Sequence, residues 1–74
     1  MTSVKEWITL HKKNKQTGDN TYVVPIKNFD SYYKGELMQV RYIEEGCLFV
    51  FRPSENKIIK IKDIENFKDP VRRS

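Results

Sequence analysis

The sequence predicts a mainly β, single small domain in which four to five antiparallel strands form a small β-barrel or a curved sheet, with one or two short helical turns. Three observations lead to this fold class. Residues 47–51 are apolar in both alternating phases, as in a strand covered on both faces. Apolar and polar residues alternate in the segments on either side of it. The length of 74 residues suits one domain with one core.

The N-terminal residues 3–11 fit two different elements, and the sequence leaves both open. In the helical interpretation, Ser3 and Glu6 form a capping box. The positions that would then share one helical face are Val4, Trp7, Ile8 and His11. In the alternative, residues 6–12 form a strand, which their β-branched and aromatic side chains favour. That strand would pair as a hairpin with residues 21–26.

The next segment, residues 12–20, is polar throughout and contains Gly18, a composition that predicts a loop. Residues 21–26 then have the composition of a strand. Because Pro25 lacks an N–H group, this strand is expected at a sheet edge, or it ends near the proline.

Three aromatic residues follow within five positions: Phe29, Tyr32 and Tyr33. Their spacing predicts one turn of α-helix or 3₁₀-helix, with Asn28 or Asp30 as its cap. Tyrosine and phenylalanine are enriched in the cores of protein interfaces, so this segment is a candidate rim for a binding site.

Residues 37–62 predict a three-stranded antiparallel meander with two tight turns. Its strands are expected at residues 38–42, 47–52 and 57–62. After it, Asp63 is expected to cap a short turn that buries Ile64 and Phe67. Residues 69–74 are expected to be a frayed tail.

Composition sets broad bounds on function. The net charge of +4 and the pI of about 9.3 permit an anionic partner without requiring one. A single cysteine excludes an internal disulfide and fits a reducing, cytoplasmic setting. No apolar run approaches a membrane span, and the N-terminus lacks the apolar core of a signal peptide. The abundance of Asn, Lys and Ile is common in AT-rich genomes, including many bacteriophages.

No set of residues predicts catalysis, a cofactor or a metal site. The single histidine, His11, has no partner ligands at metal-binding spacing. Cys47 heads the most apolar strand, where a cysteine is usually a small buried hydrophobe. The paired acids Glu44 and Glu45 fall in a turn and would not converge across a cleft. We therefore expect a non-enzymatic protein.

The leading hypothesis is a protein-binding module that acts as an inhibitor or regulator. One face of the central strand must be covered from outside the meander. Either the N-terminal segment with Trp7 and Ile8 covers it, or an apolar patch remains that marks a partner or a homodimer. The candidate protein-binding residues are Phe29, Tyr32, Tyr33, Leu48 and Val50.

The alternative hypothesis is a nucleic-acid-binding β-barrel. Arg41, Lys60 and Lys62 are expected on the wet faces of neighbouring strands, where cations track phosphates and nearby rings stack on bases. The plain explanation of these cations is that they solubilise the sheet and protect its edges. A third possibility, capture of a small molecule, has no residue signature.

Overall fold

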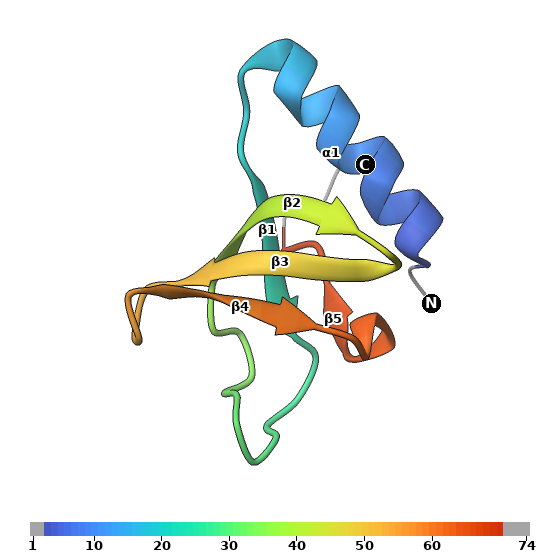
Figure 1. The fold of residues 1–74 in the computed structure, drawn as a ribbon. Helices are drawn as coiled ribbons and strands as arrows, with labels where there is room; N and C mark the ends of the chain where they lie inside the picture. The colour runs from blue at the N-terminus through green and yellow to red at the C-terminus, as the bar shows by residue number, and fades with distance from the viewer. Residues whose placement is uncertain (1–2, 71–74) are drawn as a thin grey trace.

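The computed structural model describes residues 3–70, which form one helix and five strands (Figure 1). The elements in chain order are α1 (Val4–Thr17), β1 (Thr21–Pro25), β2 (Met38–Glu44), β3 (Cys47–Arg52), β4 (Lys57–Ile61), a 3₁₀ turn η1 (Ile64–Asn66) and β5 (Phe67–Lys68).

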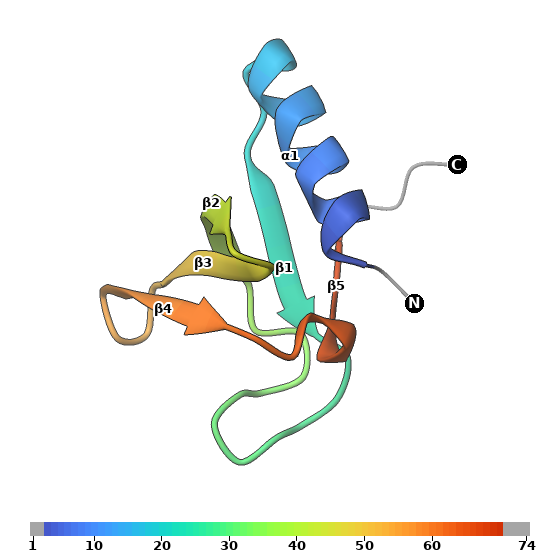
Figure 2. The same ribbon diagram turned by 45° about the vertical axis from the view of Figure 1, so that its right-hand side comes forward.

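All five strands pair antiparallel in one sheet with the order β4-β3-β2-β1-β5. The predicted meander is confirmed as β2, β3 and β4. Within residues 3–70 the edge strands β4 and β5 do not pair with each other, so the sheet is open and a barrel is not confirmed. β1 crosses the direction of β3 and β4 steeply, and α1 runs alongside β1 (Figure 2).

The N-terminal segment is a helix, so the strand interpretation is wrong. The capping box forms: the Ser3 hydroxyl accepts from the Glu6 N–H at 3.3 Å, and the Glu6 carboxylate accepts from the Ser3 N–H at 3.3 Å. These bonds satisfy backbone donors that a helix start leaves without partners. Gly18 ends the helix in a left-handed conformation, with φ of 78°.

The loop predicted at residues 12–20 is also wrong as far as Thr17, where α1 ends. Lysine and glutamine are good helix formers, and here they occupy the exposed faces of an amphipathic helix. Asn14 is the buried exception. Its amide donates to the Thr21 hydroxyl at 2.9 Å, which ties the end of α1 to the start of β1.

The core lies between α1 and one face of the sheet. Its buried side chains are Trp7, Val23, Met38, Val40, Leu48, Val50, Ile61 and Phe67. Trp7 is the largest of them and is fully buried. The helix thus supplies the aromatic side chain that closes the small core.

The aromatic segment is part of a loop, residues 26–37, so the predicted helical turn is wrong. The Asn28 side chain accepts from the Lys34 N–H at 2.8 Å, and Phe29 N–H donates to the Tyr32 carbonyl at 2.9 Å. Bonds from a side chain to nearby backbone compete with helix formation. β1 ends at Pro25, as expected from the missing N–H.

The C-terminal turn forms after Asp63 as η1, with Phe67 buried and Ile64 partly buried. Asp63 does not cap the backbone; its carboxylate accepts from the Asn66 side chain at 2.9 Å. Phe67 also begins β5, which the sequence did not predict. The expected tail lies outside the described residues from position 71 onward. No helix in residues 3–70 has the length and apolar character to cross a membrane.

Candidate binding surface on the outer face of the sheet

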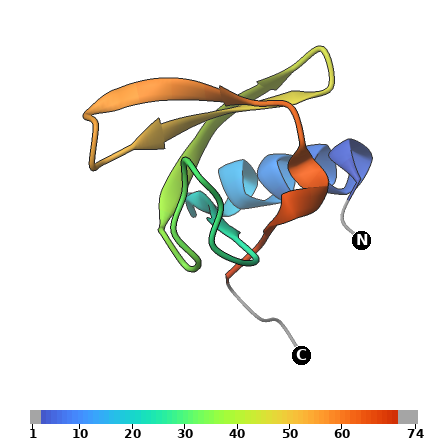
Figure 3. The ribbon, with the colours of Figure 1, turned by 90° about the horizontal axis from the view of Figure 1, so that it is seen from below.

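The two phases of β3 have different environments. Leu48 and Val50 point into the core and have no exposed surface. Cys47, Phe49 and Phe51 point the other way and are half-buried. No element formed by residues 3–70 lies over this second side of the β3–β4 hairpin, as Figure 3 shows. We call this side the outer sheet face.

A β-bulge in β2 places two successive side chains, Arg41 and Tyr42, on the outer sheet face. The register shifts between Val40 and Tyr42, so that Tyr42 pairs with Phe49. Strict alternation would send Arg41 and Tyr42 to opposite sides. With the bulge, both reach rings of the outer face: the Arg41 guanidinium lies 5.2 Å from the Phe51 centroid, and the Tyr42 ring stacks on Phe49 at 4.6 Å.

The third strand of the meander adds Ile58 and Lys60, which pair with Phe51 and Phe49 respectively. The Lys60 ammonium lies 5.9 Å from the Phe49 centroid. Because β3 lies between β2 and β4, Tyr42 and Lys60 occupy opposite faces of the Phe49 ring. Ile58 and Tyr42 are 49% and 44% exposed, which makes them the most accessible apolar parts of this surface.

The outer sheet face is therefore an aromatic and aliphatic surface bearing two cations. Its aromatic, aliphatic and cationic members are Arg41, Tyr42, Phe49, Phe51, Ile58 and Lys60, and the strand phase and register place Cys47 and Gln39 on the same side. One carboxylate, that of Glu44, is placed by the register opposite Cys47 at the end of this face. Such a surface presents positive charge beside apolar area.

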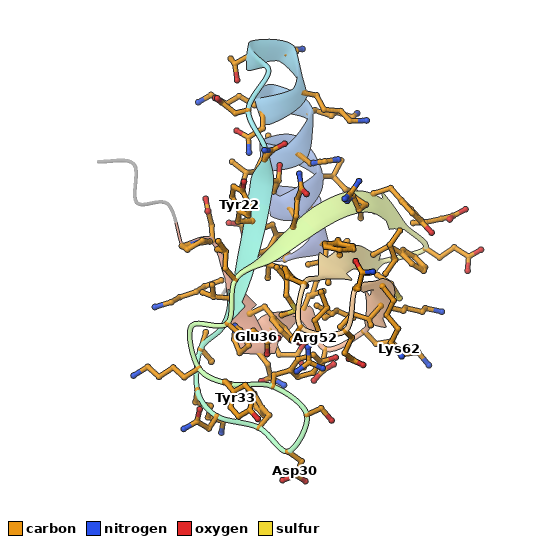
Figure 4. All side chains as sticks on the ribbon, turned by 90° about the vertical axis from the view of Figure 1, so that its left-hand side faces the viewer. Tyr22, Asp30, Tyr33, Glu36, Arg52 and Lys62 are labelled. Carbon is orange, nitrogen blue, oxygen red and sulfur yellow. The ribbon has the colours of Figure 1, made fainter. Side chains whose placement is uncertain are left out.

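A second feature is the loop 26–37, which Arg52 fastens to the sheet (Figure 4). The Arg52 guanidinium donates to both carboxylate oxygens of Glu36, at 2.7 and 3.0 Å, and to the Ser31 carbonyl at 2.6 Å. It also donates to Glu55 at 2.9 Å and lies 4.9 Å from the Tyr32 ring centroid. The loop is thus held by charge-assisted bonds.

This network shifts the ionisation of its members. The hydrogen bond from Arg52 holds the pKa of Glu36 below its ordinary value, and the same bond raises the pKa of Arg52. Burial raises the pKa of the Tyr32 phenol. All these groups keep their usual charge at neutral pH, so the network serves to position the loop.

The five predicted protein-binding residues do not form one surface. Leu48 and Val50 are in the core. Tyr32 is partly buried and packs edge-on against Phe67 with 5.3 Å between ring centroids, and Phe29 is also partly buried. Tyr33 is 73% exposed and lies between Glu36 and the loop tip at Asp30 in Figure 4.

Of the predicted nucleic-acid-binding residues, Arg41 and Lys60 lie together on the outer sheet face. Lys62 is exposed just beyond the end of β4. The prediction missed Tyr42, Phe49, Phe51 and Ile58. The doubly apolar strand was the signal for Phe49 and Phe51, but the sequence did not show which of its phases would be covered. Tyr42 and Ile58 lie on the neighbouring strands β2 and β4.

Of the residues weighed for chemistry, three lie at the turn between β2 and β3: Glu44 pairs with Cys47 in the sheet, and the Cys47 thiol lies 3.7 Å from the Glu45 carbonyl oxygen. His11 is on α1, and its Nδ1 lies 2.9 Å from the Thr21 hydroxyl; Cys47 is at the start of β3, half-buried. Within residues 3–70 no three His, Cys, Asp or Glu side chains are grouped so that they could hold a metal ion. Comparison of the chain with protein-family models, with curated proteins and with solved structures found no match.

Proposed function

We propose that this protein is a non-enzymatic binding module, an inhibitor or regulator, that occupies an acidic surface of a partner protein with its outer sheet face. The observation that carries the proposal is the half-exposed aromatic row of β3, which no other element within residues 3–70 covers. Exposed apolar patches of this kind mark interaction sites. Aromatic residues and arginine are also the side chains most enriched at interface hot spots.

Charge selects the kind of partner. Arg41 and Lys60 lie on the patch itself, so a partner with carboxylates around an apolar centre would complement it. The lone Cys47 fits a reducing compartment, and we place the interaction in the cytoplasm. A second copy of this chain would bring the same cations together and is disfavoured electrostatically.

Photo-crosslinking tests the proposal. A benzoylphenylalanine at Ile58, in the outer sheet face, should capture one partner from a lysate of the source cells, in a complex of fixed stoichiometry. The same group at Gln16, exposed on α1, is the matched control. Arg41→Glu with Lys60→Glu should abolish capture, whereas Lys5→Glu with Lys13→Glu should not. Equal capture at both positions, or none at Ile58, would overturn the proposal.

A second candidate function is binding of single-stranded nucleic acid on the same face. The observation that favours it is the pairing of cations with rings, Arg41 with Phe51 and Lys60 with Phe49. It ranks second because the Phe49 ring is stacked on Tyr42 and contacted by Lys60, which leaves this central ring unavailable to a base.

Fluorescence anisotropy with labelled single-stranded DNA and RNA separates the two candidates. Several phosphate contacts should reduce affinity about a thousandfold between about 50 and 200 mM salt. Salt-sensitive binding that Arg41→Gln with Lys60→Gln removes would promote the second candidate. Lack of binding at low salt would eliminate it.

A further inference from the structure

A hollow of about 290 Å³ lies between α1 and the free side of β2. The pairing of β2 with β1 stops at Val40, opposite Thr21, so residues 41–44 have a sheet neighbour only in β3. The helix passes on the other side of this segment (Figures 1 and 2). The side chains that line the hollow are Ile8, His11, Lys12, Lys15, Tyr42 and Ile43.

The lining combines two ammonium groups with an aromatic ring and contains no carboxylate. Lys12 and Lys15 are three residues apart on α1, so they project from the same side of the helix. Tyr42 stacks on Phe49 with the ring face turned toward β3. Tyr42 also lines the hollow together with residues of α1, so we place another planar group on the side of its ring away from Phe49.

We propose that this hollow binds a small aromatic anion of the nucleotide type, with its base against Tyr42 and its phosphate between Lys12 and Lys15. The volume is just below the range of about 300–1,000 Å³ usual for small-molecule sites, which suits one nucleotide. A ring alone would leave both ammonium groups without a counter-charge. Inorganic phosphate alone would leave the apolar wall unused. The proposal does not depend on the proposed function.

His11 provides a built-in reporter for this site. Its Nδ1 faces the Thr21 hydroxyl, which already accepts from Asn14 and so has its own hydrogen free to donate to a neutral imidazole. Burial, and then the charge of Lys15, lower the pKa of His11, while the main chain of Arg41 acts in the opposite direction. A phosphate beside Lys15 would offset the effect of that lysine, so binding should raise this pKa.

The experiment is an NMR pH titration of the single histidine, with and without adenosine 5′-monophosphate (AMP). We expect AMP to shift the His11 signals saturably and to raise its pKa. Adenosine and inorganic phosphate, each carrying half of the ligand, should bind at least about tenfold more weakly. A short oligoadenylate tests whether the nucleotide is taken from a strand. Tighter binding of the strand than of AMP would identify that source, and the reverse would identify the free nucleotide.

Two pairs of variants locate the site. Lys12→Gln with Lys15→Gln should weaken AMP binding about tenfold or more, since charge-assisted bonds to the phosphate are lost. Lys5→Gln with Lys13→Gln removes the same charge from exposed positions of the same helix outside the hollow and should leave AMP binding unchanged. Glutamine keeps helix propensity high, and circular dichroism will verify that α1 is intact.

A further variant isolates the ring. Tyr42→Leu should weaken AMP binding and leave phosphate binding unaltered, because it removes only the stacking surface. The proposal is overturned if about 10 mM AMP leaves the His11 signals unchanged, if adenosine binds as well as AMP, or if both lysine pairs have equal effects. These outcomes are separate from the crosslinking result at Ile58, so either proposal can fail while the other stands.

Discussion

The two faces of β3 are both apolar but have different environments. Leu48 and Val50 are completely buried under α1, whereas Phe49 and Phe51 are half-exposed beneath cations from the neighbouring strands. Two aromatic residues are therefore on the wet side, and two aliphatic residues are in the core. Apolar content alone does not determine which face is covered; the helix that packs on the sheet does.

Truncation of Trp7, the side chain of α1 that is buried in the core, should have the largest effect on the free energy of unfolding. Trp7→Ala deletes the biggest buried side chain and should cost about 3–5 kcal/mol, a large part of the stability of a domain this small. Trp7→Phe should cost much less. The indole N–H is buried without a hydrogen-bond partner in residues 3–70, so its loss removes an unfavourable group. Denaturant unfolding measures both, and equal costs would contradict the role of ring volume.

A matched pair on β3 tests the contrast between faces directly. Leu48→Ala should lower the free energy of unfolding by about 2–5 kcal/mol because it opens a cavity in the core. Phe51→Ala deletes more atoms but should cost less, since its site opens to water and the ring was half-exposed. If Phe51→Ala proves the more damaging change in urea unfolding, the outer sheet face is structural rather than a binding surface.

The loop contact should show in the pH dependence of stability. The pKa of Glu36 is below its ordinary 4.5, so its pairing with Arg52 stabilises the fold above that pH. This stabilisation is lost as the pH falls through the lowered pKa. Glu36→Gln should lower the free energy of unfolding by about 1–2 kcal/mol at neutral pH, because the Glu36 side chain is only 13% exposed. The variant should also lose less stability than the original protein when the pH is lowered into the acid range. If the free energy of unfolding, measured at successive pH values, falls equally steeply in acid for the variant and the original protein, the prediction is contradicted.

The smallest expected effect is the ring–ring coupling on the outer sheet face. A double-mutant cycle of Tyr42→Ala and Phe49→Ala should give an interaction of about 0.5–1.5 kcal/mol for a stacked pair. Pairing Tyr42→Ala with Ile59→Ala, on the opposite side of the sheet, should give additive costs. Coupling near zero for the first pair would mean that the rings are free to separate, as a surface that reorganises on binding would require.

The meander was predictable because its information is local. Strands of period two and turns marked by Gly46 and Pro53 lie next to one another in the chain. The Ser3–Glu6 capping box was also visible, but a seven-residue pattern fits a strand as well as a helix. The polar run after His11 was misinterpreted because an exposed helix face and a loop have similar polarity.

The candidate site was less predictable, because it depends on contacts distant in sequence. Arg41 and Lys60 were identified from strand alternation alone. Tyr42 and Phe49 become neighbours only through the bulge, which shifts the register by one residue. The fastening of the loop by Arg52 joins residues 16 and 21 positions apart, a separation that periodicity does not report.

By itself the sequence determined a β meander with a central strand apolar on both sides, since side-chain alternation follows from backbone geometry. Only the tertiary structure decided which side became the core. That choice depends on where α1 packs, and its packing is set by burial over the whole molecule: Trp7 joins Leu48 and Val50 in one buried cluster. The face with Phe49 and Phe51 is then left exposed to solvent.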